Sequence, residues 1–508
     1  MGDSCHVVGP VNNSTGGPPA RRSRGKWIWT TVAVVIVVAI AVVLVTVRPW
    51  TAEFRHGGLR IAAAPTPAQV SPRVVPAFEQ GNPPSTPGLQ KALAQVAASP
   101  DLGSFSGSVS DPATGKAVWS ASSDKPVIPA STLKVLTAGA AMLALPPDHR
   151  LTTRVVAGST PGEVVLVGAG DPTLTAQPDG KGYYTNAPKL SDLISQIRAG
   201  GHPVDSVVVD NSAYAGPTWP AGWDPADIAG GSWAPIESVM LDGGRLDPLA
   251  DYSRRSGTPA LDAGRRLAQG LGVDPAKVHL GKAAPGAADL AHVDSALLRD
   301  RLRDMMNHSD DVLAEAIGRE IAGAAGGERS FAGAAAATAT TLHAAGFDIT
   351  GMSLVDNSGL SVNDRVPARL LDRILAVAAG SATTPAEGTA GSTSGVPQPS
   401  TGADPTGAAG GTSPPGASLA PLLDYLPIAG GSGTLADRFA DRGPQRAGAG
   451  WVRAKTGTLS VSSALAGYVL DRDGRVMTFA LMSNDRPPEA SRPALDTVAT
   501  ALRNCGCS

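Results

Sequence analysis

A serine and a lysine, Ser131 and Lys134, form a pair that could catalyse nucleophilic attack. They stand three residues apart at the start of a run that is apolar on nearly every face and stops at Pro146 and Pro147. Such a run predicts a buried helix, on which residues three apart share a face. Because burial favours the neutral form of a lysine, its amine can remove the proton of a neighbouring serine hydroxyl. The spacing predicts a nucleophilic Ser131 with Lys134 as its base; a helix-capping serine beside a lysine that reaches solvent is the alternative.

A second motif that could bind a substrate is Lys455-Thr456-Gly457-Thr458. Lys455 and Thr456 offer a cation and a hydroxyl to a substrate carboxylate, and Gly457 lets a ligand approach the backbone closely. Lys455 is the only lysine after residue 282, which makes a chance match less plausible. The motif lies in the first of three strand-like stretches, which predict an antiparallel β-sheet. These stretches are 451–458, 464–470 and 476–482.

Together the two motifs give the chain a resemblance to a known superfamily. S-x-x-K followed by K-T-G is the signature of penicillin-binding proteins and serine β-lactamases. The separation of 321 positions from Lys134 to Lys455 is too long for an ordinary β-lactamase. The chain resembles instead the DacB-type D-alanyl-D-alanine carboxypeptidases/endopeptidases, the class C low-molecular-mass penicillin-binding proteins, which carry large extra domains between these motifs. Three further stretches are similar to that family: 167–174, 356–361 and 426–435.

The resemblance implies an α/β (α+β) fold: a penicillin-binding-protein/β-lactamase-like transpeptidase domain, with an antiparallel sheet flanked by helices, and a large inserted domain. The predicted organisation is a disordered cytoplasmic tail (1–26), a transmembrane anchor (27–47), a Pro-rich linker (48–87), the first part of the transpeptidase-like domain (88–174), the inserted domain (175–290) and the second part (291–503), which includes a disordered insert (380–417).

It also implies an activity and roles for the motif residues. Ser131 would attack the penultimate D-Ala carbonyl of a peptidoglycan stem peptide, with the backbone N–H groups of Ser131 and Thr458 as the oxyanion hole. Lys455 and Thr456 would hold the terminal carboxylate. β-Lactams would acylate Ser131 because they mimic the D-Ala-D-Ala terminus.

Ser309-Asp310-Asp311 occupies the place of the family's middle motif, Ser-x-Asn, between two amphipathic runs. By resemblance, Ser309 would pass a proton to the leaving amine; its alternative role is to cap the following helix. Asp311 departs from the family's asparagine. An ionised aspartate only accepts hydrogen bonds, and beside Lys134 it would favour the protonated lysine. Either Asp311 is protonated, or substrate is held differently, or activity is weakened.

The apolar run 27–47 is long enough to span a bilayer. Four basic residues at 21–26 precede it, and only Arg48 follows at once, so we expect the N-terminus in the cytoplasm and the remainder on the cell-wall side. A cleaved signal peptide is the alternative, although its apolar region is usually shorter. The stretches 48–87 and 380–417 are low in large apolar residues and predict a spacer and a disordered loop.

Composition excludes several other functions. A net charge of −2 provides no basic field for nucleic acid. Three cysteines and scattered histidines offer no zinc spacing, so we expect neither metal nor cofactor. The glycines at 168 and 170 lack the third glycine and the helix of a dinucleotide site. The remaining hypotheses are a serine carboxypeptidase or endopeptidase, a catalytically weakened cell-wall-binding protein, and a β-lactamase, which the long insertion disfavours.

Overall fold

The computed structural model describes residues 24–47, 81–250, 252–380, 419–440 and 443–507. The chain divides into two compact units, 1–78 and 79–508. The first contains helix α1 (Arg24–Val47), which covers the predicted anchor and whose side chains are described over 32–46. No helix within the described residues is both long and apolar enough to cross a membrane. The anchor stays a prediction. The predicted tail, most of the predicted linker and the predicted loop at 381–417 lie outside the described residues.

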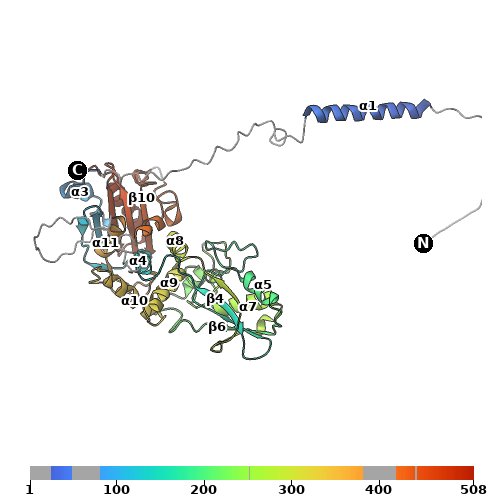
Figure 1. Ribbon diagram of the computed structural model, residues 1–508. Coiled ribbons are helices and arrows are strands. Elements are labelled where there is room, and N and C mark those ends of the chain that lie inside the picture. Colours follow the sequence, from blue (N-terminus) through green and yellow to red (C-terminus); the bar gives the residue numbers. More distant parts are fainter. Residues whose placement is uncertain (1–23, 48–80, 251, 381–418, 441–442, 508) are drawn as a thin grey trace, which may run out of the picture. The chain divides into compact units, whose positions relative to one another are not determined.

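The second unit is built on an antiparallel sheet that joins distant parts of the sequence. Its strand order is β10-β11-β12-β1-β2, and β1 pairs with β12 so that Ser104 lies opposite Asn484. Figure 1 labels β10 in this sheet. The three strand-like stretches around the K-T-G motif therefore form the antiparallel strands that their pattern predicts. The strands are β1 (Ser104–Asp111), β2 (Lys116–Ala121), β10 (Val452–Leu459), β11 (Ser462–Leu470) and β12 (Val476–Asn484).

Alternating side chains of this sheet enter two separate cores, as the two-residue period of a strand requires. Leu465 and Phe479 pack against α3 (Thr86–Leu93) and α13 (Pro488–Arg503). Ala464 packs against a larger layer of helices on the opposite face. The result is a sheet flanked by helices, as predicted. The larger layer contains α4 (Lys134–Ala144), α8 (Leu298–His308), α9 (Asp311–Ala324), α10 (Phe331–Ala344) and α11 (Ala368–Ala379).

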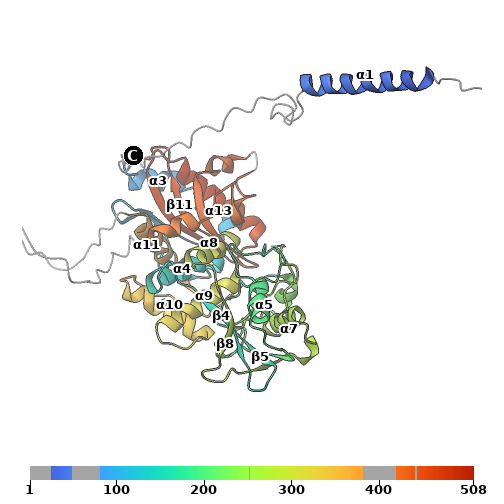
Figure 2. The ribbon, with the colours of Figure 1, turned by 45° about the vertical axis from the view of Figure 1, so that its right-hand side comes forward.

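A second sheet, of order β7-β6-β5-β4-β8, lies on the far side of these helices (Figure 2). β5, β6 and β7 are parallel, whereas β4 is antiparallel to β5 and β8. Helices α5 (Leu190–Ala199) and α7 (Pro259–Leu271) contribute to its core. Two of its strands, β4 and β5, precede residue 175, the predicted start of the inserted domain. They belong to this sheet because β4 pairs with β5, and β5 pairs along its whole length with β6. Its strands are β4 (Thr152–Ala157), β5 (Glu163–Val167), β6 (Ser206–Asp210), β7 (His279–Gly281) and β8 (Asp289–Asp294).

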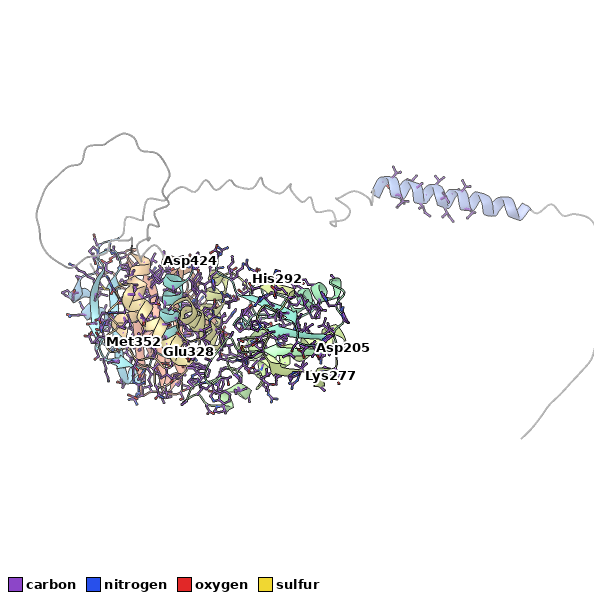
Figure 3. The ribbon with its side chains drawn as sticks, turned by 60° about the horizontal axis from the view of Figure 1, so that its bottom comes forward. Asp205, Lys277, His292, Glu328, Met352 and Asp424 are labelled. Carbon is purple, nitrogen blue, oxygen red and sulfur yellow. A yellow bond between two sulfur atoms is a disulfide. The ribbon has the colours of Figure 1, made fainter. Side chains whose placement is uncertain are left out.

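The second sheet and its helices lie within residues 148–296, which we call the second region. An aromatic cluster joins the second region to the helical layer. Trp223 and Trp233 pack with Val312 of α9 and Phe331 of α10. Figure 3 shows the helices between the two sheets, with His292 of β8 on one side of them. The remaining short elements are β3 (Pro126–Val127), which pairs with β9 (Val366–Pro367), α6 (Ala226–Gly230), and the 3-10 turns η1 (Pro100–Leu102), η2 (Ala130–Leu133), η3 (Asp242–Gly244), η4 (Pro275–Lys277), η5 (Ala420–Tyr425), η6 (Gly433–Leu435) and η7 (Pro444–Gly448).

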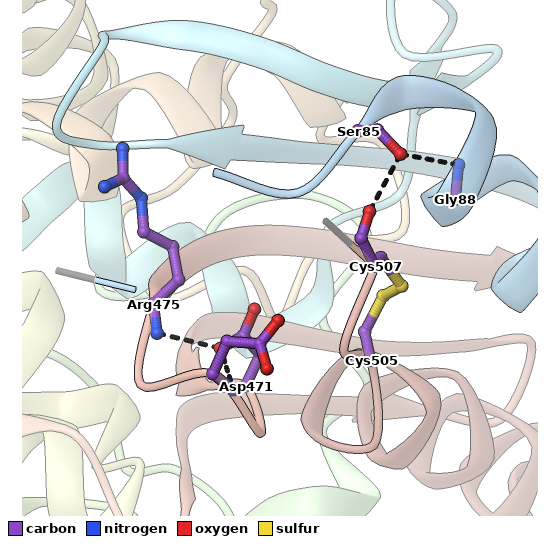
Figure 4. Close-up of a disulfide and its surroundings, with 7 residues drawn as sticks. Ser85, Gly88, Asp471, Arg475, Cys505 and Cys507 are labelled. Atoms are coloured by element: carbon purple, nitrogen blue, oxygen red, sulfur yellow. Dashed lines mark hydrogen bonds between the residues drawn. A yellow bond between two sulfur atoms is a disulfide. The ribbon is translucent and has the colours of Figure 1, made fainter. Parts of the chain in front are cut away.

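A disulfide joins Cys505 and Cys507 near the C-terminus (Figure 4). The Ser85 backbone N–H and the Ser85 hydroxyl both donate to the Cys507 carbonyl oxygen, each at 2.8 Å. Ser85 also caps α3, and Cys505 is buried in the core that α3 and α13 share. The C-terminal segment is thus fastened to the first helix of the second unit.

Candidate active site

Ser131 lies in the tight turn η2, directly before α4. The preceding residue, Ala130, has a φ of 46°, a left-handed conformation that is uncommon for a residue with a side chain. Two glycines enclose this turn. A Cβ added at Gly457 would lie 2.8 Å from the Pro129 carbonyl oxygen, and one added at Gly359 only 2.0 Å from the Ala130 carbonyl oxygen. Gly457 therefore leaves room for the turn that carries Ser131, and the close approach of a ligand to its backbone stays a prediction.

Lys134 occupies the centre of the site, with a fully buried side chain. Its Nζ donates to Ser131 Oγ at 3.1 Å, to the Ser358 carbonyl oxygen at 2.8 Å and to Asp311 Oδ1 at 2.6 Å. The alternative of a lysine that reaches solvent is excluded. Three acceptors match the three N–H bonds of an ammonium group, so the Asp311 carboxylate favours the charged lysine, as its position suggested.

Asp311 is the first residue of α9 and its side chain is 12% exposed. Burial raises its pKa above the usual value, while the charge and hydrogen bond of Lys134 act in the opposite direction. Asp311 and Lys134 thus form an ion pair at 2.6 Å. A proton that moves from Lys134 to Asp311 leaves a neutral amine 3.1 Å from Ser131 Oγ.

Ser309 ends α8, with φ 57° and ψ 36°. It does not cap the following helix, which is the alternative that the sequence left open: Asp310 does so, through a hydrogen bond of 2.8 Å from the Leu313 N–H to Asp310 Oδ1. The Ser309 hydroxyl instead accepts a hydrogen bond of 2.8 Å from Lys455 Nζ.

Lys455 is fully buried and also donates to the Thr456 carbonyl oxygen at 2.8 Å. Burial and the charge of Lys134 lower its pKa well below the usual value, although Asp311 opposes this shift. A neutral Lys455 amine can exchange a proton with the Ser309 hydroxyl. The site therefore contains two Ser–Lys pairs, and Lys455 faces Ser309 rather than the open cleft.

These groups meet at a cleft of about 700 Å³. Ser131, Ser309, Asp311, Thr456 and Thr458 line it, whereas Lys134, Lys455 and Gly457 lie behind its wall. The hydroxyl of Thr456 is 2.7 Å from that of Thr434, which joins the K-T-G strand to η6. The opposite wall comes from the second region, and no feature of the sequence predicts that this region lies here. Its lining residues include Tyr183, Arg245, Tyr252 and Arg255.

A buried carboxylate holds the loop that positions Lys134. Glu315 Oε1 accepts hydrogen bonds from the backbone N–H groups of Asn357 and Ser358, each at 2.8 Å. Burial, followed by the charge of Asp356, raises the pKa of Glu315 to about 7. The Ser358 carbonyl in turn accepts from Lys134. The stretch 356–361 is similar to the family in sequence, but nothing in the sequence links it to Glu315.

Within the described residues, no group of three or more histidine, cysteine, aspartate or glutamate side chains could hold a metal ion. The chemistry available at the cleft is that of hydroxyls, amines and carboxylates. Two serine hydroxyls, each bonded to a buried lysine, suit nucleophilic attack and proton transfer at an acyl group.

Comparison with known proteins identifies the class. The chain matches the D-Ala-D-Ala carboxypeptidase 3 (S13) family over residues 89–252, 249–389 and 416–504, and it belongs to that family. It is 47% identical to Carboxypeptidase Rv3627c of Mycobacterium tuberculosis and 48% identical to Carboxypeptidase DacB of Mycolicibacterium smegmatis, each over 88% of this chain and 90% of the relative.

Solved structures agree on the fold. Penicillin binding protein 4 (dacB) from Haemophilus influenzae is 19% identical, with a TM-score of 0.61 over 82% of this chain and 98% of that protein. Its structure complexed with a β-lactam gives a TM-score of 0.55 at 20% identity, over 81% and 98% of the two chains. The penicillin-binding-protein fold predicted from the two motifs is therefore confirmed.

Substituting Gly457 with alanine should slow acylation of Ser131 by about 10-fold, because the new Cβ would press on Pro129 and Ala130 and displace the nucleophile. The rate is measured with a fluorescent penicillin. Gly257→Ala is the matched control, since no atom lies within 4 Å of a Cβ at that position. Equal rates in Gly457→Ala and the unmodified protein would show that the contact does not fix Ser131.

Proposed function

We propose that the protein is a serine D-alanyl-D-alanine carboxypeptidase that trims peptidoglycan stem peptides through an acyl-enzyme on Ser131. The observation that carries this proposal is the meeting of two Ser–Lys pairs, Ser131 with Lys134 and Ser309 with Lys455, at one cleft. Membership of the S13 family and the two carboxypeptidase relatives support the same reaction.

In the proposed acylation, the Lys134 amine takes the proton of Ser131 while Oγ attacks the penultimate D-Ala carbonyl. The backbone N–H groups of Ser131 and Thr458 stabilise the resulting oxyanion. The C–N bond then breaks, and Ser309 gives its proton to the departing D-Ala amine. Lys455, whose Nζ is 2.8 Å away, passes to Ser309 the proton that Lys134 took from Ser131, so that Lys134 is again a neutral amine. Water, deprotonated in the same way by Lys134, hydrolyses the ester and restores Ser131.

The carboxylate of the terminal D-Ala is assigned to the hydroxyls of Thr456 and Thr458, which line the cleft. Lys455 donates a hydrogen bond to the Thr456 carbonyl oxygen and so positions Thr456, rather than contacting the substrate carboxylate itself. β-Lactams would acylate Ser131, since the same carbonyl and carboxylate positions are available to them. The complex of the Haemophilus influenzae protein with a β-lactam supports this expectation.

Release of D-Ala from a peptide that ends in D-Ala-D-Ala tests the proposal. We expect turnover by the full chain, and slow hydrolysis of penicillin. The Lys134–Asp311 contact favours one competing function, a catalytically weakened cell-wall-binding protein. Penicillin acylation without D-Ala release would support that function, and rapid penicillin hydrolysis would support a β-lactamase.

We further propose that the catalytic unit acts on the cell-wall side of the cytoplasmic membrane and is tethered by α1. The apolar sequence of α1 and the basic residues before it support this orientation. The Cys505–Cys507 disulfide also supports it, because disulfides persist mainly in oxidising compartments. Protease added outside intact spheroplasts should remove the catalytic unit; its protection would overturn the orientation.

A further inference from the structure

The second region contacts the catalytic motif Ser309-Asp310-Asp311 through a buried arginine. Arg245 follows the turn η3 and its side chain is 2% exposed. It donates from Nη2 to Asp310 Oδ2 at 2.9 Å and from Nη1 to the Asp242 carbonyl oxygen at 3.2 Å. The ring of Tyr183 packs against the guanidinium, whose carbon lies 3.3 Å from the ring centroid.

Asp310 is the residue through which this contact reaches the active site. Its Oδ2 accepts from Arg245 and, at 3.0 Å, from the hydroxyl of Tyr184, while its Oδ1 accepts from the Leu313 N–H. Although burial opposes it, the charges of Arg245 and Arg255 hold the pKa of Asp310 well below its usual range. Asp310 is thus an anion bonded on one side to α9 and on the other to the second region.

The neighbours of Asp310 need such support. Ser309 adopts a left-handed conformation that a residue with a side chain keeps only when its surroundings impose it. The Ser309 hydroxyl accepts a hydrogen bond from Lys455, and Asp311, two residues further on, accepts one from Lys134. Both contacts depend on the backbone conformation at Ser309. A second contact comes from the ring of Tyr183, which lies 5.0 Å from that of His308. Both sides of Ser309 are therefore in contact with the second region.

We infer that Arg245 is a positioning residue for the reaction, which fastens Asp310 so that Ser309 and Asp311 keep their places beside the two lysines. The second region is then a required part of the active site rather than an appended domain. This inference rests on the proposed function for its kinetic consequence, but its structural consequence can be measured independently.

Arg245→Met removes the hydrogen bonds and keeps much of the side-chain length. We expect kcat for D-Ala release to fall 10- to 100-fold, because displacement of a catalytic group by about 1 Å costs up to roughly 10²-fold, with KM changed less than about threefold. Arg245→Lys should recover part of the loss, since an ammonium can still pair with Asp310. Asp310→Asn combined with Arg245→Met should be no slower than the slower single variant.

The control is Arg475→Met, which breaks another buried pair: Arg475 bonds Asp111 at 2.7 Å, away from the cleft. It should lower the melting temperature at least as much as Arg245→Met while leaving kcat within about twofold. A rise in KM with unchanged kcat in Arg245→Met would instead make Arg245 a substrate contact and overturn the inference. So would a loss of kcat that merely tracks melting temperature across both variants.

Hydrogen exchange supplies the readout that does not depend on turnover. In Arg245→Met, and in Tyr184→Phe to a smaller degree, the amides of 308–314 should exchange faster, while those of the strand 476–484 stay protected. Unchanged exchange at 308–314 would overturn the inference even in an active enzyme. Conversely, absence of D-Ala release by the unmodified protein would overturn the proposed function, and faster exchange at 308–314 would still support the positioning contact.

Discussion

Replacing Lys134 with methionine is expected to lower the rate of Ser131 acylation by about 10²- to 10⁴-fold, the usual contribution of a positioned base. Methionine has a similar length but cannot take the proton of the Ser131 hydroxyl. It would also leave Asp311 and the Ser358 carbonyl oxygen without their donor. The rate is followed as the time course of labelling by a fluorescent penicillin.

Lys125→Met is the matched control for this experiment, because Lys125 bonds the Ser104 hydroxyl at an exposed position. It should label at the rate of the unmodified protein. The melting temperature of Lys134→Met should be measured as well, so that misfolding is separated from loss of the base. Labelling of a folded Lys134→Met protein at the unmodified rate would show that another group deprotonates Ser131.

Asp311→Asn is expected to keep the enzyme active and to extend its activity to lower pH. The ionised Asp311 stabilises the ammonium form of Lys134, from which it is 2.6 Å distant, and that form cannot act as a base. Asparagine removes this stabilisation and restores the amide donor of the family's Ser-x-Asn motif. Where Asp311 is ionised, the gain should correspond to about 1–3 kcal/mol, or roughly 5- to 100-fold in acylation rate.

The direction of the pH effect follows from the raised pKa of Asp311. As pH falls through that value in the unmodified protein, Asp311 binds a proton and no longer stabilises the ammonium form of Lys134. The difference between the two proteins should therefore be largest above the pKa of Asp311, where the carboxylate is ionised, and should shrink as pH falls through it. Asparagine does not stabilise the ammonium form at any pH, so the acidic limb of the rate profile should move to lower pH.

Penicillin acylation of both forms from pH 5 to 9 measures this difference. Asp424→Asn, at an exposed position of η5, is the control and should leave the profile unchanged. If Asp311→Asn is inactive at every pH, the carboxylate is itself an essential proton acceptor. Its description as a substitute for the family's asparagine would then be wrong.

Residues that are close in sequence were predictable. Ser131 and Lys134 share a face because they are one helical turn apart, and alternation of side chains places the strands around Lys455 in one sheet. The pairing of these motifs across 321 residues follows from family resemblance rather than from local pattern. The predicted helices on either side of Ser309 also match α8 and α9.

Contacts between distant segments were not predictable in the same way. No residue near Arg245 in the sequence predicts its contact with Asp310. Likewise, the sequence around Glu315 does not predict that Glu315 binds the backbone of Asn357 and Ser358. The strand pattern around Gly457 does not reveal that the turn of Ser131 packs against it. The sequence pattern does not reveal that β5 belongs to the second sheet, because this follows only from its pairing with β6.

The most direct test of the central claim is to identify the residue that penicillin acylates. The full chain is incubated with a penicillin, digested and examined by mass spectrometry. We predict one penicilloyl group, on the peptide that contains Ser131, and no labelling of a Ser131→Ala variant whose melting temperature is unchanged. Acylation at Ser309 or at any other residue, or persistent labelling of Ser131→Ala, would contradict the account.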